Sequence, residues 1–165
     1  MMMQELRIRK ATVDDILFLF RICENQTLDE LSLWGADLVY QYPPLLKQMQ
    51  ESFLSRKNTV LFAAECGGEI VGFAEITKID EILKTGVLAR IVLDPERRGK
   101  GIGRTFIQEI MKYSACELGL ETISLIVYVK NVRAQRCYES CGFQNMGLLI
   151  RPGKPDAYKM EVSLK

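Results

Sequence analysis

The stretch DPERRGKGIGR, residues 94–104, connects two regular patterns in the sequence. Before it, the apolar residues 87–93 predict a strand, and after it the amphipathic residues 106–118 predict a helix. Glycines in such a turn let backbone N–H groups approach an anion closely, and the helix dipole favours negative charge there. Four cationic side chains add to this tendency: Arg97, Arg98, Lys100 and Arg104. The stretch therefore predicts a site for a phosphorylated ligand.

Size and composition predict a single domain over residues 1–165. The chain has 165 residues, of which 48% are hydrophobic, and this is enough for one core. A formal net charge of +1 gives no general attraction to nucleic acid or to an anionic membrane. No apolar run approaches the roughly 20 residues that cross a bilayer. We therefore expect neither nucleic acid nor a membrane as a partner.

The cysteine and histidine counts restrict the chemistry. The five cysteines show neither CxxC pairing nor paired metal-ligand spacing, and the chain has no histidine, so no metal is expected. An odd number of cysteines without a secretory signal indicates a reducing, cytoplasmic location. Ser-His-Asp and Cys-His catalysis are excluded. Any acid or base is therefore a carboxylate, a tyrosine, a cysteine, a lysine, a chain terminus or water.

Hydrophobic periodicity predicts an α/β fold in the order β-α-α-β-β-β-α-β-α-β-β. The strands are expected at 6–9, 60–66, 70–79, 85–93, 122–129, 143–151 and 157–164, and the helices at 12–23, 43–53, 103–117 and 131–140. Residues 26–42 are ambiguous. The helix at 103–117 and its two flanking strands form a predicted right-handed βαβ unit, in which ligands bind at the carboxyl ends of the strands.

Glycine spacing distinguishes between kinds of phosphate-binding loop. A Walker loop, GxxxxGK[ST], is absent, and residues 99–103 have the spacing GxGxG where a dinucleotide loop needs GxGxxG. Arg98, Gly101 and Gly103 instead form R-x-x-G-x-G. The segment NVRAQRCYESCGF at 131–143 has the pattern N-x-x-A-x-x-x-Y-x-x-x-G-F. These two motifs, in this order and with one predicted strand between them, resemble those of the GCN5-related N-acetyltransferases, the GNAT family.

The resemblance implies a fold and an activity. The implied fold is a central mixed sheet of about seven strands flanked by about four helices. The implied enzyme transfers acetyl from acetyl-coenzyme A directly to a primary amine in a ternary complex. A catalytically weak acetyl-coenzyme A-binding sensor or scaffold is the alternative. A homodimer is possible, because dimers are common in the family and the final strands are apolar.

The acceptor is left open by the resemblance. It is an amine of a small molecule or of a protein, and acyl groups other than acetyl remain possible. Residues 24–45 are expected to wall the acceptor side of the site, where Trp34, Tyr40 and Tyr42 either face an aliphatic amine or pack in the interior.

The resemblance also implies which residues bind the cofactor. In similar proteins the backbone of the glycine-rich loop wraps the pyrophosphate, and the preceding strand pairs its backbone with the pantetheine arm and polarises the thioester carbonyl. Asn131 would contact this arm as well as capping the short helix, and Ala134 would leave room for it. The full set is Ile91, Val92, Leu93, Arg98, Gly99, Lys100, Gly101, Ile102, Gly103, Arg104, Asn131, Ala134 and Tyr138.

Two residues are catalytic candidates. Tyr138 occupies the tyrosine position of the second motif and would donate a proton to the leaving thiolate, since a comparable thiol has a pKa of about 8.5. A packed aromatic side chain is the alternative. Glu75, at an inward-facing position of the strand VGFAEITK, is a candidate general base, with a water chain as the alternative. Cys137 is not expected to act as a nucleophile, because similar enzymes transfer acetyl directly and no histidine is present to activate it.

Overall fold

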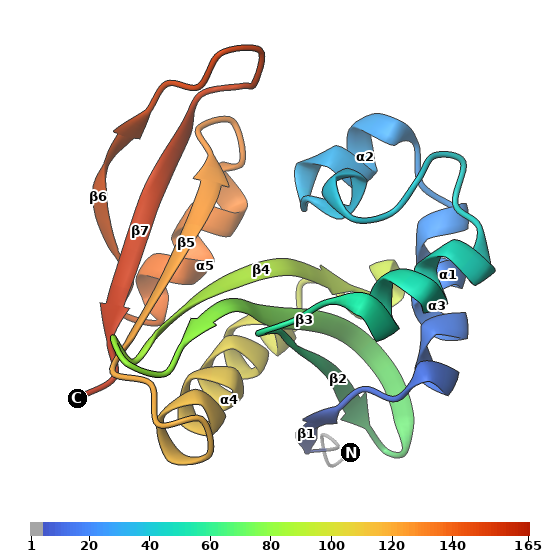
Figure 1. The fold of residues 1–165 in the computed structure, drawn as a ribbon, viewed down its shortest axis with the longest axis horizontal. Coiled ribbons are helices and arrows are strands. Elements are labelled where there is room, and N and C mark those ends of the chain that lie inside the picture. The colour runs from blue at the N-terminus through green and yellow to red at the C-terminus, as the bar shows by residue number, and fades with distance from the viewer. Residues whose placement is uncertain (1–4) are drawn as a thin grey trace.

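The computed structural model describes residues 5–165, in which seven strands form one mixed sheet with the order β1-β2-β3-β4-β5-β7-β6 (Figure 1). Within this range β4 and β5 form the one parallel pair, and the other neighbours are antiparallel. The predicted mixed sheet and the parallel βαβ pairing are confirmed. The strands are β1 (Leu6–Lys10), β2 (Val60–Cys66), β3 (Glu69–Asp80), β4 (Thr85–Leu93), β5 (Thr122–Tyr128), β6 (Gln144–Leu149) and β7 (Ala157–Ser163). The expected domain of 1–165 includes residues 1–4, which lie outside the described residues.

Five α-helices and three short 3₁₀ turns accompany the sheet in the described residues, where the sequence predicted four helices. The additional helix, α2, is six residues long and lies in the ambiguous region. Its sequence is too short to show a period, but Thr27 and Glu30 form a capping box at its start. No helix in residues 5–165 is long and apolar enough to cross a membrane. The helices are α1 (Ile16–Glu24), α2 (Leu28–Leu33), α3 (Leu46–Ser55), α4 (Ile102–Cys116) and α5 (Val132–Ser140), and the turns are η1 (Val13–Asp15), η2 (Ala36–Leu38) and η3 (Pro95–Arg97).

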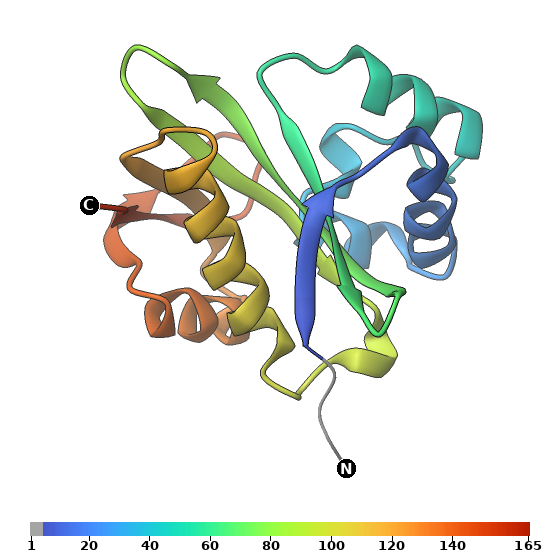
Figure 2. The same cartoon turned by 90° about the horizontal axis from the view of Figure 1, so that it is seen from below.

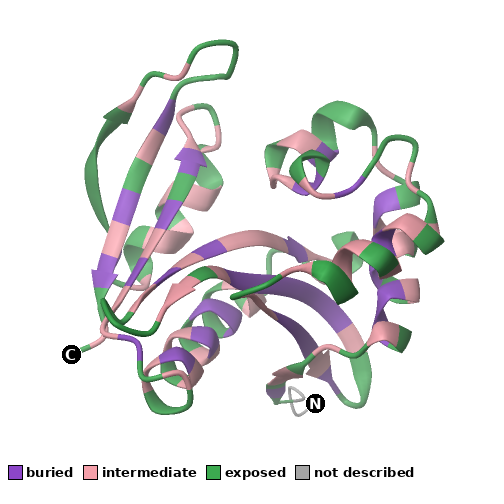
Figure 3. Cartoon of the chain, viewed as in Figure 1, coloured by how far each residue is buried: buried purple, intermediate pink, exposed green. Residues whose placement is uncertain are grey.

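The helices cover both faces of the sheet and produce two separate cores. Figure 2 shows α4 and α5 on one side of the strands and α1 to α3 on the other. Phe62 of β2 belongs to the same core as Ile110 of α4, whereas its neighbour Leu61 belongs to the core that contains Leu19 of α1. A strand that is buried on both faces reads as a continuous apolar run, which is why β2 was predicted with its exact bounds. Figure 3 shows this burial along the central strands and the exposed surface of β6.

The strands β4 and β5 separate soon after they begin to pair. Their ladder covers only Thr85–Val87 and Thr122–Ser124. Beyond these residues the two halves of the sheet diverge into a V, with β1 to β4 on one side and β5 to β7 on the other (Figure 1). The edge of β4 that faces β5 therefore lacks a partner strand over its second half.

A β-bulge in β4 lies just beyond the point of separation. On β3, Phe73 pairs with Val92 and Glu75 pairs with Ala89, so β4 contains one more residue than β3 in this interval. Arg90, within the bulge, has a φ of 50°. A left-handed conformation costs an L-residue about 1–2 kcal/mol, so tertiary contacts must hold it in place.

We predict that Gly72→Ala destabilises the protein by about 1–3 kcal/mol through overpacking. A Cβ at Gly72 would lie 2.7 Å from the Val92 carbonyl oxygen, and this backbone atom cannot move without disturbing the β3–β4 ladder. Gly86→Ala is the matched control on β4, because its nearest neighbours are the ends of two side chains. Urea unfolding should show the larger loss for Gly72→Ala, and a larger loss for Gly86→Ala would contradict this explanation.

Candidate active site

The separation of β4 and β5 produces a cleft of about 790 Å³. Residues 87–93 and 126–128 form its two strand walls. The region of α2 and η2 lines it on one side, while the start of α4 and the helix α5 line it elsewhere. Segments that are distant in the sequence thus meet around one hollow at the carboxyl ends of β4 and β5. The sequence predicted a ligand at this end of the strands.

The glycine-rich loop has the backbone geometry of an anion site. Gly99 has a φ of 80° and Gly101 has a φ of 74°, values that favour glycine. Gly101 is the N-cap of α4, and it has no side chain to satisfy the first N–H groups of the helix. These N–H groups and the positive end of the helix dipole therefore favour an anion.

Most of the cofactor-binding residues predicted from the sequence line the same cleft. Lys100 and Ile102 do not line it, and the nearby Arg97 donates to Glu69 at 2.7 Å instead. The predicted residues brought together there are Ile91, Val92, Leu93, Arg98, Gly99, Gly101, Gly103, Arg104, Asn131, Ala134 and Tyr138.

Sequence reasoning missed one cation beside this loop. Arg133 lines the cleft, and its Nη2 atom would lie 3.8 Å from a Cβ built on Gly99. It occupies a variable position of the second motif, in the first turn of α5. A cation is unfavourable at a helix N-terminus. The position of Arg133 in the first turn of α5 was therefore the one sequence signal that this side chain has a role outside the helix.

The start of α5 is fixed by side-chain contacts with the preceding turn. The Oδ1 atom of Asn131 accepts a hydrogen bond from the Ala134 N–H at 3.3 Å, so this residue caps the helix. The side-chain amide of Gln135 donates to the carbonyl oxygens of Tyr128 and Val129 at 2.9 and 2.8 Å. These bonds attach α5 to the end of β5 and hold its first turn at the cleft.

Tyr138 lies on α5 and lines the cleft. Its ring packs against Phe143 with 5.8 Å between centroids and a tilt of 59°. Burial raises the pKa of the Tyr138 hydroxyl above its ordinary value, so the phenol keeps its proton throughout the neutral range. Within residues 5–165 no hydrogen bond to this hydroxyl is found, which leaves it available to a ligand.

The two cysteines of α5 and its end are protonated thiols. Burial raises the pKa of Cys137, and it also raises the pKa of Cys141, whose Sγ donates to the Arg104 carbonyl oxygen at 3.7 Å. A thiol with a raised pKa is a poor nucleophile, which agrees with the expectation for Cys137. No cluster of three or more potential metal ligands is found in the described residues, and the absence of a metal stays a prediction.

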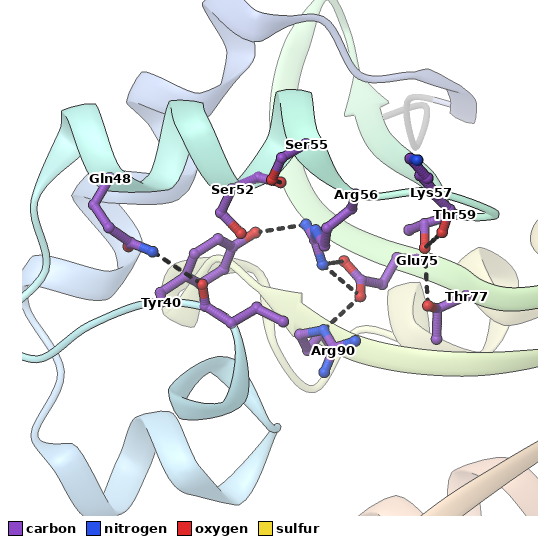
Figure 4. A network of polar contacts seen from close by, with 11 residues as sticks. Tyr40, Gln48, Ser52, Ser55, Arg56, Lys57, Thr59, Glu75, Thr77 and Arg90 are labelled. Atoms are coloured by element: carbon purple, nitrogen blue, oxygen red, sulfur yellow. Dashed lines mark hydrogen bonds and ion pairs between the residues drawn. The ribbon is translucent and has the colours of Figure 1, made fainter.

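The side chain of Glu75 is fully buried in an ion-pair network (Figure 4). Both of its carboxylate oxygens accept from Nη1 of Arg56, at 2.8 and 2.6 Å, and one also accepts from Nε of Arg90. Nη2 of Arg56 donates to the hydroxyl of Tyr40 at 3.1 Å. Glu75 thus faces the interior of the protein. It does not line the cleft, whereas Arg90 does, and its role as a base stays a prediction.

The three aromatic residues expected near the acceptor have different positions. Trp34 lines the cleft, with its indole N–H donating to Gln26 Oε1 at 2.8 Å. Tyr40 belongs to the core on the α1 side, where burial raises its pKa to about 12. Tyr42 is exposed and does not line the cleft. One of the three therefore faces the site, and none of these positions follows a period that the sequence could reveal.

Comparison with known proteins identifies the family. The sequence model of the "Acetyltransferase (GNAT) family" matches residues 25–143. The chain belongs to this family of acetyltransferases. A spermidine N(1)-acetyltransferase from Vibrio cholerae is 26% identical over 149 residues, which are 90% of this chain and 84% of the relative.

Two further comparisons support the family assignment. An aminoglycoside N(6')-acetyltransferase type 1 from Klebsiella pneumoniae is 23% identical over 168 residues, covering 93% of this chain and 81% of the relative. The crystal structure of the spermidine N-acetyltransferase from Vibrio cholerae in complex with CoA and spermine has a TM-score of 0.81. It is 25% identical and covers 96% of this chain and 95% of that one. The expected GNAT fold is confirmed.

We predict that Glu75→Gln lowers the free energy of unfolding by about 3–5 kcal/mol, because it removes the counter-charge of two partly buried guanidinium groups. The side chains of Arg56 and Arg90 are only 16% and 12% exposed. The control is Glu69→Gln, which removes a carboxylate that is 73% exposed. Its effect should stay within about 0.5 kcal/mol. Equal urea midpoints for the two variants would show that the network contributes little to stability.

Proposed function

We propose that this protein is an N-acetyltransferase that transfers acetyl from acetyl-coenzyme A directly to a primary amine. One observation carries the proposal: the unpaired edge of β4, the glycine-rich start of α4 and Tyr138 share a single cleft. Each of these features fits a different part of the donor, namely the amide-bearing arm, the pyrophosphate and the sulfur. The two relatives described above are named as acetyltransferases of amines, which supports the same activity.

The proposed pyrophosphate site is the turn between β4 and α4. Backbone N–H groups from Gly99 to Gly103 would bind the phosphate oxygens, and Arg98, Arg104 and Arg133 would neutralise their charge. Lys100 and Ile102 would contribute through the backbone, since their side chains do not line the cleft. The pantetheine amides would pair with the free edge of residues 91–93 as an added strand does.

The proposed reaction exchanges one bond for another at the acetyl carbon. The neutral amine nitrogen attacks the thioester carbonyl, so a C–N bond forms and a tetrahedral oxyanion develops. A backbone N–H of the free β4 edge would stabilise this oxyanion. The C–S bond then breaks, the nitrogen loses one proton, and the sulfur gains one. The products are the N-acetyl amine and coenzyme A with a free thiol.

Tyr138 is the proposed acid for the leaving sulfur. A thiolate comparable to that of coenzyme A has a pKa of about 8.5, so a nearby hydroxyl that is still protonated stabilises it as it departs. Because its pKa is raised, the Tyr138 hydroxyl keeps its proton at neutral pH. Its lack of a partner within residues 5–165 supports this role over that of a packed aromatic side chain.

The proton from the amine has two possible destinations, Glu75 or water. The Glu75 carboxylate is fully buried and shared between Arg56 and Arg90, and it does not line the cleft. These contacts favour a structural role for Glu75. We therefore propose that the amine is deprotonated through water.

Location and assembly belong to the same proposal. All five cysteines are free, which supports the cytoplasmic location expected from the sequence. The edge strand β6 is exposed, with Met146 and Leu148 more than half exposed, and this surface supports a homodimer. Size-exclusion chromatography with light scattering measures the oligomeric state directly.

The activity test is release of the coenzyme A thiol when the purified protein receives acetyl-coenzyme A and a panel of amines. Turnover should be accompanied by an acetylated amine in mass spectrometry. Calorimetry with acetyl-coenzyme A, taken together with this amine panel, distinguishes an enzyme from a sensor. Tight binding without thiol release for peptides, polyamines, aminoglycosides and amino acids would reject the enzyme and favour the sensor.

We predict that Tyr138→Phe lowers kcat by about 100-fold, because it removes the proton donor while keeping the ring. The Kd for acetyl-coenzyme A should change little. Tyr113→Phe is the matched control, since Tyr113 packs on Phe62 away from the cleft. An unchanged kcat for Tyr138→Phe would remove this residue from the mechanism.

A further inference from the structure

The charged side chains that line the cleft all have the same sign. Among the described residues the lining contains no aspartate or glutamate. The chain as a whole has a net charge of only +1, so this concentration is local. The lining cations are Lys78, Arg90, Arg98, Arg104, Arg133 and Arg151. A cleft of this kind attracts anions and repels cations.

The phosphates of the donor account for only part of this charge. Arg98 and Arg104 flank the glycine-rich loop, and Arg133 approaches Gly99 from α5. The other three cations come from β3, from the β4 bulge and from the turn between β6 and β7. They are therefore carried by elements other than the proposed pyrophosphate site.

Arg90 is held by its bond to Glu75 of β3. That carboxylate is also held by Arg56, which bonds to Tyr40 in the core on the α1 side (Figure 4). A Cβ on Gly35 would lie 3.5 Å from Cγ of Arg90, which places Arg90 beside η2. Within residues 5–165 its two terminal nitrogens have no hydrogen-bond acceptor. One carboxylate faces two guanidinium groups, so the network has an excess positive charge beside the cleft.

Arg151 provides a second cation with unused donors. Its guanidinium carbon lies 5.8 Å from the centre of the Tyr128 ring, and Nη2 donates weakly to the Pro155 carbonyl oxygen at 3.4 Å. Its Nε atom is buried and has no partner in the described part of the chain. Within residues 5–165 its Nη1 atom has no acceptor either, so the guanidinium has donor capacity that an anionic ligand in the cleft would use.

The remaining wall on this side is apolar. Leu33, Trp34, Leu38 and Val39 line the cleft from the region of α2 and η2. This region also contains the acidic residues Asp29, Glu30 and Asp37, but none of them lines the cleft. Aliphatic and aromatic side chains therefore meet a ligand there without a compensating carboxylate.

We infer that the acceptor is an amine that also carries a carboxylate and an apolar body, as an apolar amino acid does. This inference rests on the proposed acetyl transfer, and it names the substrate class. Arg151 would bind the carboxylate, Arg90 and Lys78 would add positive charge to the same cleft, and the wall of α2 and η2 would bind the apolar part. A polyamine would meet only like charge in this cleft, so the acceptor class differs from that named for the spermidine acetyltransferase relatives.

The first test measures binding through Trp34, which is the only tryptophan of the chain and lies in the cleft wall. Its fluorescence is followed as protein saturated with coenzyme A is titrated with apolar amino acids, with the matching amino acid amides and with spermidine. Each acid should bind about 10-fold or more tightly than its amide, because only the acid offers a charged acceptor. The inference is overturned if no acid is preferred over its amide, or if spermidine binds more tightly than the acids.

The second test removes the proposed carboxylate partner. Arg151→Gln should raise the Kd and KM for the preferred acid by about 10-fold while changing those for its amide by less than about 2-fold. The Kd for acetyl-coenzyme A should stay the same. Lys154→Gln, an exposed change in the same turn and outside the cleft lining, is the matched control. Equal losses of affinity for the acid and the amide would show that Arg151 has only a structural role, and would overturn its assignment as the carboxylate partner.

Failure of this inference differs from failure of the proposed function. Preferential binding of the acid without thiol release would leave the ligand class intact and reject acetyl transfer. Thiol release with polyamines and none with amino acids would support acetyl transfer and overturn the ligand class.

Discussion

The Glu75 carboxylate connects three elements of the fold, one of which, β4, forms a wall of the cleft. It belongs to β3, and it accepts hydrogen bonds from Arg56 at the end of α3 and from Arg90 in the β4 bulge. Arg90 has a left-handed backbone that costs about 1–2 kcal/mol for an L-residue. A charge-assisted bond to a fully buried carboxylate is strong enough to offset this cost. The backbone conformation of the bulge therefore depends on that contact.

The opening of the sheet follows from how its two halves are covered. The strands β1 to β4 are packed between α4 and the helices α1 to α3, whereas β5 is held on its other side by β7 (Figure 2). Each half is therefore stable without a continuous ladder between β4 and β5. The short ladder of three residues on each strand holds the halves together at one end only. The other end is open to an extended ligand.

Local sequence features predicted the donor side of the site more completely than the acceptor side. The continuous apolar run of β2 and the glycines of the β4–α4 turn have local causes, namely burial on both faces and positive φ angles. The contacts of Arg90 with Glu75 and of Arg133 with the loop join residues that are distant in the sequence. No period or motif encodes such contacts, and they appear only when the chain is folded.

Helix α2 is another feature that the sequence pattern did not predict. Its six residues are fewer than two turns, so an amphipathic period cannot be recognised, although its capping box was visible in the sequence. The missed helix carries part of the apolar wall, including Leu33. The proposed acceptor-facing surface therefore lies in the segment whose secondary structure was ambiguous.

Hydrogen–deuterium exchange with and without acetyl-coenzyme A tests most directly whether the free edge of β4 and the start of α4 bind the donor. Amides without a partner exchange quickly, and a bound pantetheine arm and pyrophosphate would protect them. Peptides that cover residues 88–104 should become protected, while those that cover β6 should not change. Protection elsewhere, or none at 88–104, would contradict the placement of the donor in this cleft.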